Sequence, residues 1–403
     1  MKKLYTNYIN TFKGLSTEVW WLALITFINR SGTMIIPFLS LYLREDMKIS
    51  QTNVGWVMTC FGLGSVAGAW LGGKLTDKIG YYKVMVRSLL STGFLFIGLQ
   101  FLDTFAQICI GIFLVMTVAD TFRPAMYVAM SVYSKPKNKT RSVTLIRLAI
   151  NLGFSAGPAI GGLIIATIGY SGLFWVDGIT CILATVLLVS VLNPRKAKAV
   201  DTDVNDNPIS VNKDKPYWIF FAAMVLFAFI FMQYFSTMPL YYKDIHLLSE
   251  PEIGYLLGLN GLIIFLIEMP IIAWLENSNY TKIGLTLFGL ALTILSLFVL
   301  NITPWLGILV IGIVLMTIGE MIGFPMSNAF AMHRSKRGKQ GEYLAMYVMA
   351  FSIASIFSHN AGLQMSAYLG YEFTWYFMCA LGVVGVLLLV YLKRILKKKN
   401  ELY

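Results

Sequence analysis

Residues 73–83 read Gly-Lys-Leu-Thr-Asp-Lys-Ile-Gly-Tyr-Tyr-Lys, a short charged segment between two apolar runs at 52–73 and 84–102. Each run is close to the roughly 20 residues that a helix needs to cross the hydrocarbon core of a bilayer. Glycine at Gly73 and Gly80 allows the chain to reverse tightly between the runs. The stretch therefore predicts two antiparallel membrane-spanning helices that are joined by a charged tight turn.

The same alternation of apolar runs and polar segments continues along all 403 residues. Hydrophobic residues make up 57% of the chain and charged residues 13%, whereas about 25% of the residues in a typical soluble domain are charged. Only helices and closed barrels satisfy every backbone group in lipid, and these runs lack the alternation of barrel strands. We expect an all-α integral membrane protein with twelve transmembrane helices, near residues 20–43, 52–73, 84–102, 107–132, 142–166, 172–192, 217–241, 252–275, 283–300, 305–332, 342–368 and 373–392.

Basic residues lie mostly on one side of this arrangement. With both termini in the cytoplasm, 26 of the 32 Lys and Arg residues fall on the inner side, as the positive-inside rule requires. The net charge of +12 then reflects topology, and we expect no nucleic-acid partner. We expect a multi-pass protein of the plasma membrane, the inner membrane in a bacterium, that works as a monomer.

The longest polar stretch separates two halves of similar size. Residues 193–216 combine low hydrophobicity with mixed charge, which is typical of a linker. We expect an N-terminal six-helix bundle at 1–192, a cytoplasmic linker at 193–216 and a C-terminal six-helix bundle at 217–403. Prolines and acids at matching places indicate that the halves are repeats. The matched sets are Pro37 and Pro239 in the first and seventh runs, and Asp120 before Pro124 and Glu320 before Pro325 in the fourth and tenth runs.

The fifth run carries a second motif, Gly-Phe-Ser-Ala-Gly-Pro-Ala-Ile-Gly-Gly at 153–162. Its glycines allow close helix packing, and Pro158 permits a bend. It resembles the helix 5 stripe G-x-x-x-G-P-x-x-G-G of antiporters of the major facilitator superfamily, and 73–83 resembles that superfamily's helix 2–3 loop (G-x-L-a-D-r-x-G-r-[rk]). The resemblance covers essentially the whole chain. It implies two pseudo-symmetric bundles and is strongest to the twelve-helix drug:proton antiporters.

Both motifs have a mechanical interpretation as gating elements. Asp77 can pair across the cytoplasmic face with Lys83 or Arg87 and thereby hold one state of the transporter. Tyr81 and Tyr82 stand where the family usually has basic residues, so Lys83 carries the positive charge of the loop. The gating candidates are Gly73, Asp77, Gly80, Lys83, Gly153, Gly157, Pro158, Gly161 and Gly162.

Charged residues inside the apolar runs are the candidates for coupling and substrate binding. Each costs about 2.5–3.5 kcal/mol at a helix centre, so each must face a cavity or a partner. Asp120 and Arg123 are three residues apart and can form an ion pair on one helix face. That pair either neutralises two buried charges or couples transport to protons. Asp177 lies near the outer end of its run, from where it can reach the interface.

Glu268 and Glu320 have no basic residue within one helical turn. Burial disfavours the charged form of a carboxyl group, which suits the binding and release of a proton near neutral pH. A hydrogen-bonded protonated acid is the structural alternative, and a packing role is the alternative for a histidine. The full set of proton or substrate candidates is Arg30, Asp120, Arg123, Arg147, Glu268, Glu320 and His359.

The chain lacks the sequence patterns of an enzyme. It has no Gly-x-x-x-x-Gly-Lys-[Ser/Thr] loop, no zinc motif and no nucleophile motif, so we expect no cofactor, no metal and no ATP hydrolysis. The resemblance implies a proton-coupled exporter of amphiphilic drugs or other small molecules that works by alternating access. The alternatives are a proton-coupled importer of peptides or another small nutrient, and a non-transporting receptor or scaffold.

Overall fold

The computed structural model of the chain describes residues 14–32, 34–135, 139–194, 210–276, 278–335, 340–399 and 401. Across these ranges the regular structure is helical, without a β-strand. The elements are α2 Thr17–Ser31, α3 Ile35–Leu41, the π-helix η1 Tyr42–Asp46, α4 Gln51–Ile79, α5 Tyr81–Leu99, α6 Phe105–Asp120, α7 Phe122–Tyr133, α8 Lys139–Ile168, α9 Tyr170–Val191, η3 Val211–Lys213, α10 Lys215–Phe231, η4 Met232–Phe235, α11 Thr237–Asp244, α12 Glu250–Glu276, α13 Lys282–Phe298, η5 Val299–Asn301, α14 Gly307–Ser335 and α15 Gln340–Lys398.

The number of membrane spans agrees with the sequence. Eleven helical stretches in the described ranges are long and apolar enough to cross a membrane. The last, Glu342–Lys398, has 57 residues and would be about 85 Å long as one straight helix, far more than a bilayer core needs. It is interrupted at Gly370, whose φ of 82° and ψ of 167° are not helical and suit glycine. Counting its two parts separately gives the twelve predicted spans.

Spans 1 and 7 are both broken, as the matched prolines Pro37 and Pro239 suggest. In span 1, α2 ends at Ser31 and α3 begins at Ile35. In span 7, α10 passes into η4, and the non-helical Ser236 (φ −132°, ψ −57°) separates η4 from α11. Because proline has no backbone N–H, it leaves the carbonyl four residues earlier without its helical donor.

Spans 4 and 10 do not match each other in the same way. Span 4 is divided into α6 and α7 at Thr121, three residues before Pro124. Span 10 is the continuous helix α14, which includes Pro325. Of the two matched sets, the prolines of spans 1 and 7 thus correspond to a break in both spans.

The segment 73–83 differs from the tight turn that its glycines predict. Helix α4 continues through Gly73 to Ile79, and α5 begins at Tyr81. Gly80, with φ of 86° and ψ of 146°, makes the turn alone. The prediction of a turn at Gly73 is wrong: this glycine is helical, and a Cβ there would meet no atom within 4 Å.

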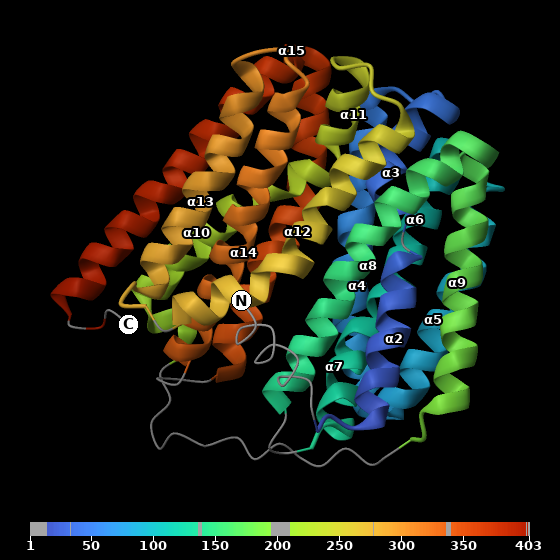
Figure 1. Ribbon diagram of the computed structural model, residues 1–403, viewed down its shortest axis with the longest axis horizontal. Coiled ribbons are helices and arrows are strands. Elements are labelled where there is room, and N and C mark those ends of the chain that lie inside the picture. The colour runs from blue at the N-terminus through green and yellow to red at the C-terminus, as the bar shows by residue number, and fades with distance from the viewer. Residues whose placement is uncertain are drawn as a thin grey trace, which may run out of the picture. The chain divides into compact units, whose positions relative to one another are not determined.

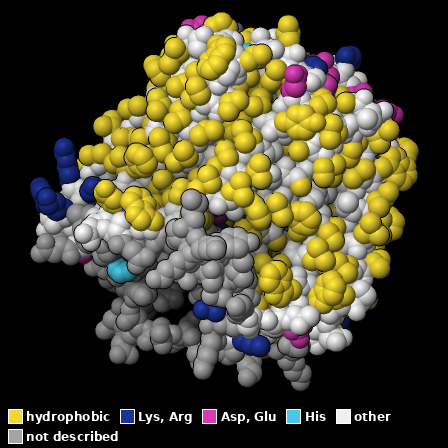
Figure 2. Space-filling model, in the orientation of Figure 1, with side chains coloured by type: hydrophobic (Ala, Val, Ile, Leu, Met, Phe, Trp, Pro, Cys, Tyr) yellow, Lys and Arg dark blue, Asp and Glu magenta, His cyan; other side chains and the backbone are white. Residues whose placement is uncertain are grey.

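Large apolar side chains are exposed on the outside of the helices. Trp70, Phe94 and Trp274 are 60%, 61% and 65% exposed. On the face seen in Figure 2, hydrophobic side chains cover the middle of the helices, and charged side chains gather near their ends. This distribution is the one that contact with lipid hydrocarbon favours, because exposed apolar area of this extent is unusual in a monomeric soluble protein.

The chain divides into two compact contact units. The first comprises Met1–Phe38, Cys60–Val200 and Glu250–Leu262, and the second comprises Leu39–Thr59, Asp201–Ser249 and Ile263–Tyr403. In the first, α2 packs against α8 and α9, and α5 packs against α9 (Figure 1). In the second, α10 packs against α15, and α13 packs against α14. The predicted division into six-helix bundles at 193–216 stays a prediction, and residues 195–209 of that linker lie outside the described residues.

Candidate functional site

The break in span 4 positions an ion pair. Pro124 has no N–H to donate to the carbonyl of Asp120, so α6 ends at Asp120 and α7 starts two residues later. Arg123 Nη2 donates to Asp120 Oδ1 at 3.0 Å, and Ser65 Oγ on α4 donates to Asp120 Oδ2. The predicted ion pair is thus confirmed, and both carboxylate oxygens have a donor.

The two partners differ in their access to solvent or lipid. Asp120 is 5% exposed, whereas the Arg123 side chain is 50% exposed. The carboxylate is therefore fixed among helices, and the guanidinium is carried by a long side chain at the surface. Such an arrangement lets Arg123 move away without unfolding the helix that carries it.

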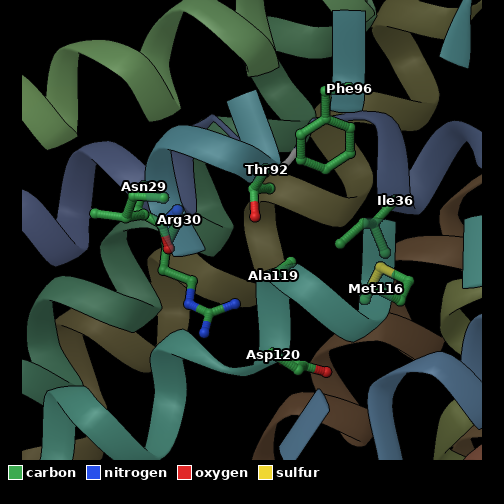
Figure 3. A pocket seen from close by; sticks show the side chains of 9 residues that line it. Asn29, Arg30, Ile36, Thr92, Phe96, Met116, Ala119 and Asp120 are labelled. Carbon is green, nitrogen blue, oxygen red and sulfur yellow. The ribbon is translucent and has the colours of Figure 1, made fainter. Parts of the chain in front are cut away.

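Arg30 and Asp120 line the same pocket. Arg30 lies in the last turn of α2, with its Cζ 5.6 Å from the centroid of the Phe154 ring. The space at this pocket amounts to about 400 Å³ when the open solvent at its mouth is included. Figure 3 shows the Arg30 guanidinium and the Thr92 hydroxyl turned toward this space, with Asp120 at its edge. Its lining residues are Asn29, Arg30, Ile36, Leu89, Thr92, Phe96, Met116, Ala119 and Asp120.

Asp177 does not reach an interface, and in this respect the expectation from its sequence position is wrong. Its side chain on α9 is fully buried. Asp177 Oδ1 and Oδ2 each accept a hydrogen bond of 2.9 Å, from the backbone N–H groups of Met34 and Ile35. These donors start α3 and have no helical partner after the break in span 1. Asp177 therefore holds the broken end of span 1 directly beyond Arg30.

The helix 5 stripe packs against this same broken span. A Cβ at Gly153 would lie 2.5 Å from Arg30 Cβ, and one at Gly157 would lie 3.2 Å from the Ser31 carbonyl oxygen. A Cβ at Gly161 would lie 3.1 Å from Met34 Cβ. The three glycines are spaced by one turn each and let α8 approach span 1 more closely than large side chains would allow.

A second face of α8 packs against the first half of α12. A Cβ at Gly162 would lie 2.4 Å from the Glu250 carbonyl oxygen, and one at Gly254 would lie 2.3 Å from the Pro158 carbonyl oxygen. Ser155 Oγ donates to the Gly258 carbonyl at 2.8 Å. The sequence analysis missed the glycines of α12, although Gly254 and Gly258 show the spacing that is typical of close helix pairs.

The remaining titratable candidates lie on other helices. In the second unit, Glu268 on α12 is 5% exposed, Glu320 on α14 is partly buried, and His359 on α15 is 2% exposed. His359 Nδ1 lies 2.9 Å from the Oγ of Ser236, at the break in span 7. In the first unit, Arg147 is partly buried on α8. Of the seven candidates, the pocket brings together Arg30 and Asp120, and the ion pair adds Arg123.

The structure describes some of the gating candidates in the helix 2–3 segment and leaves out the side chain of one. The backbone of Asp77 belongs to α4, but its side chain lies outside the described residues. Lys83 is exposed on α5. Tyr81 is 4% exposed, and its ring meets that of Tyr133 edge-on at 5.9 Å. Tyr81 is therefore a packing residue in a place where the family usually has a cation.

A buried ion pair in the second unit was also missed. Arg334 Nε and Nη2 each donate to the carboxylate of Asp214 at 2.7 Å, and the Tyr343 hydroxyl donates to it at 3.0 Å. Asp214 also accepts from the Tyr217 N–H at 3.3 Å as the N-cap of α10. The Asp-Lys-Pro sequence at 214–216 indicates the start of a helix. It does not predict the ion pair, because Arg334 on α14 is 120 residues away along the chain.

Comparisons with known proteins agree with this architecture. The chain is 21% identical over 396 residues to a Na⁺, Li⁺, K⁺/H⁺ antiporter of Planococcus maritimus, covering 89% of this chain and 91% of the antiporter. It is 25% identical over 281 residues to a multi-drug resistance efflux pump PmrA homolog of Lactococcus lactis, covering 66% of this chain and 67% of the pump. Its fold matches the crystal structure of a POT family transporter in complex with 5-aminolevulinic acid, with a TM-score of 0.78, 13% identity and coverage of 96% of this chain and 97% of the other.

The sequence model of one family covers most of the chain. Its description is Major Facilitator Superfamily, and its matches extend over residues 19–359 and 281–402. These matches include both helix 2–3 and helix 5 motifs, the pocket residues and the helices of both units. With its twelve spans, the chain is a membrane transporter that belongs to the Major Facilitator Superfamily.

Proposed function

We propose that this chain is a proton-coupled secondary active transporter that exports amphiphilic small molecules by alternating access. The observation that carries the proposal is the buried Asp120 carboxylate, held by Arg123 and Ser65 at a break in span 4. A buried carboxylate whose partners are all fixed has a structural role, whereas one whose partner can leave can couple a proton to a movement. The half-exposed side chain of Arg123 is a partner that can leave.

The two relatives support both parts of the proposal. The Planococcus maritimus relative is described as a cation/proton antiporter, and the Lactococcus lactis relative as a multi-drug efflux pump. The first favours exchange against protons, and the second favours export. At 21% and 25% identity, neither identifies the substrate of this chain.

The proposed coupling step takes place at Asp120. When Asp120 is ionised, its charge holds Arg123 across the Thr121 break through a charge-assisted hydrogen bond. Protonation of the carboxylate removes that charge, so Arg123 leaves, and α6 and α7 are free to change their angle. Loss of the proton on the other side of the membrane restores the pair. A proton thereby moves once per conformational cycle.

Acids in the second unit supply a second proton site. Glu320 stands on span 10, at the place in the repeat that Asp120 occupies on span 4, and Glu268 stands on span 8. His359 at the span 7 break and Arg147 on α8 are further candidates for this path. We assign Arg30 to the substrate, because its guanidinium points into the pocket (Figure 3).

Gating in this proposal uses the two sequence motifs. Asp77 and Lys83, beside the hinge at Gly80, stabilise one state from the cytoplasmic side. Close packing of α8 at Gly157 prevents leakage of protons during exchange. We place both termini in the cytoplasm and the protein, as a monomer, in the plasma membrane, which in a bacterium is the inner membrane. The partners are small-molecule substrates, protons and lipid, without nucleic acid.

Neutral replacements of the two acids test the coupling role. We expect Asp120→Asn and Glu320→Gln to lower gradient-driven accumulation of substrate in proteoliposomes at least tenfold and to spare exchange without a gradient. The substrate panel contains tetraphenylphosphonium, 2-naphthoate, a dipeptide and a sugar. Asp103→Asn, at an exposed carboxylate in the loop before α6, is the matched control and should behave as wild type. Undiminished accumulation by both variants would remove these acids from the coupling step.

A further inference from the structure

Thr92 on span 3 carries a buried hydroxyl that faces a pocket. Thr92 is 2% exposed, and in the described part of the chain its Oγ1 is buried without a hydrogen-bond partner. Threonines in helices can donate back to the carbonyl four residues earlier, as Thr117 and Thr185 do here. The Thr92 hydroxyl instead turns toward the pocket that Asp120 also lines (Figure 3). A buried hydroxyl without a partner costs free energy, so we expect its partner inside the pocket.

The pocket has the size and the polarity of a water site. It leaves about 30 Å³ for the centres of water-sized atoms, and one water needs about 10–15 Å³ on this measure, so about two waters fit. A buried water also needs about two to four polar partners. The lining supplies them, with polar groups on Asn29, Arg30, Thr92 and Asp120. All the lining residues belong to the first contact unit.

Charges of both signs surround this pocket. Arg30 and Asp120 line it, and Arg123 pairs with Asp120 at 3.0 Å. The buried Asp177 holds the start of α3 directly beyond Arg30. An ion of either sign in the pocket would thus meet a group of its own sign. Water donates to carboxylates and accepts from guanidinium and hydroxyl groups, so it suits all of these partners.

Asp120 can accept a further hydrogen bond from such a water. Its two oxygens each accept one bond, from Arg123 and from Ser65, whereas an ionised carboxylate has about four lone-pair sites. The Thr92 hydroxyl can donate and accept at the same time. A chain of hydrogen bonds can therefore run from Thr92 through water to the carboxylate. Because the pocket opens to solvent at its mouth, this chain also reaches the solvent.

We infer that ordered water in this pocket joins the Thr92 hydroxyl to the Asp120 carboxylate and is the route by which protons reach Asp120. A proton enters at the mouth, each water accepts one proton and passes another on, and the carboxylate ends protonated. Thr92 is a positioning residue that holds the water in line. The inference rests on the proposed proton-coupled function and adds the path of the proton to it. The path does not use Arg30, which the proposed function assigns to the substrate.

Hydroxyl-radical footprinting tests whether the pocket is hydrated. A short X-ray pulse converts bound water into hydroxyl radicals, which oxidise the side chains beside that water, and mass spectrometry measures the rate at each residue. Phe96 and Met116 line the pocket and are 2% and 7% exposed. Phe174 and Met130, which are 1% and 9% exposed, do not line it and are the matched controls.

The two pairs of residues give the outcome of this measurement. In purified wild-type protein in detergent, we expect oxidation at least fivefold faster at Phe96 than at Phe174, and at Met116 than at Met130, because only the pocket residues lie beside water. Equal rates within both pairs would show a dry pocket and overturn the inference.

Variants of Thr92 test whether its hydroxyl holds the water and guides the proton. Thr92→Val removes the hydroxyl at nearly the same size, whereas Thr92→Ser keeps it. We expect Thr92→Val to slow substrate-driven proton uptake by proteoliposomes at least tenfold and to lower the oxidation of Phe96, and Thr92→Ser to stay within twofold of wild type. Thr117→Val is the matched control, because the Thr117 hydroxyl donates to a carbonyl of its own helix and does not line the pocket. Proton uptake at the wild-type rate by Thr92→Val would overturn the proposed path.

Thermal unfolding of Thr92→Val gives a second measurement that needs no substrate. If nothing pairs with the Thr92 hydroxyl, its replacement by a methyl group removes an unpaired polar group and raises the unfolding temperature. If water pairs with it, the replacement loses that hydrogen bond. We expect an unfolding temperature no higher than that of wild type, and a higher one would contradict the water site.

Failure of the path differs from failure of the proposed function. If the footprint shows water but the wild type moves no protons with any member of the substrate panel, the water site stands and the proton-coupled function fails. If the wild type and Thr92→Val move protons equally well, the proton-coupled function stands and the path inferred here is wrong.

Discussion

At the scale of single residues, sequence spacing predicted some contacts and missed others. Asp120 and Arg123 are three apart on one chain segment, so their pairing follows from helix geometry. The burial of Asp177 does not, because its partners are backbone N–H groups that the break in span 1 leaves without helical acceptors. Thr92 was likewise missed, since nothing in its neighbourhood along the chain shows that its hydroxyl faces a pocket.

Asp177 carries a prediction about stability. We expect Asp177→Leu to lower the free energy of unfolding more than Asp177→Asn does, because Leu leaves both N–H groups unpaired and Asn can still accept from one. An unpaired buried donor costs about 1–3 kcal/mol. Thermal unfolding in detergent measures the stabilities of the two variants relative to wild type. Asp103→Asn is the control for the loss of an exposed carboxylate. Equal stability of Asp177→Leu and wild type would contradict the capping role.

The Asp214 and Arg334 pair makes a second prediction at this scale. Arg334 is 2% exposed, and its Nη1 also pairs with Glu401 Oε2 at 3.2 Å. Asp214→Asn therefore removes one of its counter-charges and should lower the free energy of unfolding, by less than the roughly 3–5 kcal/mol that losing the whole of a buried pair costs. The double variant Asp214→Asn, Arg334→Met removes both charges and should regain part of that loss. A double variant no more stable than the single variant in thermal unfolding would show that the charges do not depend on each other.

At the scale of elements, apolar runs predicted the helices well but not their interruptions. Helix α4 continues six residues past Gly73, to Ile79, because glycine permits a turn without requiring one. Proline is the stronger signal, since it removes a backbone donor. Even so, α14 continues through Pro325 whereas span 4 breaks before Pro124. Whether a helix is interrupted at a proline is therefore not decided by the proline alone, and sequence periodicity does not predict it.

The α8 stripe gives the prediction for this scale. Gly157→Leu forces α8 away from Ser31, whose carbonyl oxygen would be 3.2 Å from the new Cβ. We expect this variant to fold, to dissipate an imposed proton gradient in liposomes and to lose export. Gly98→Leu is the control, because a Cβ at Gly98 meets nothing within 4 Å. A tight, fully coupled Gly157→Leu transporter would show that close packing at this position is dispensable.

At the scale of the whole molecule, composition and motifs were enough to predict the superfamily. Twelve spans follow from hydropathy, and the family follows from two motifs that lie on helices 2–3 and 5. What the motifs do not predict is the site, because Arg30, Thr92 and Asp120 come from three spans and meet only after the chain folds. The direction of transport likewise depends on the order of proton and substrate events and not on the fold, which importers and exporters share.

The most direct test of the proposed exchange is the direction of proton movement when substrate moves. Wild-type protein is reconstituted in liposomes with a pH-sensitive dye inside, and an outward gradient of the panel substrate that gives the largest flux is applied without an initial pH gradient. The account predicts that substrate leaving the liposomes brings protons in, so the interior becomes more acidic, and that Asp120→Asn abolishes this signal. An interior that becomes more alkaline as substrate leaves would show that both move together and would contradict the antiporter.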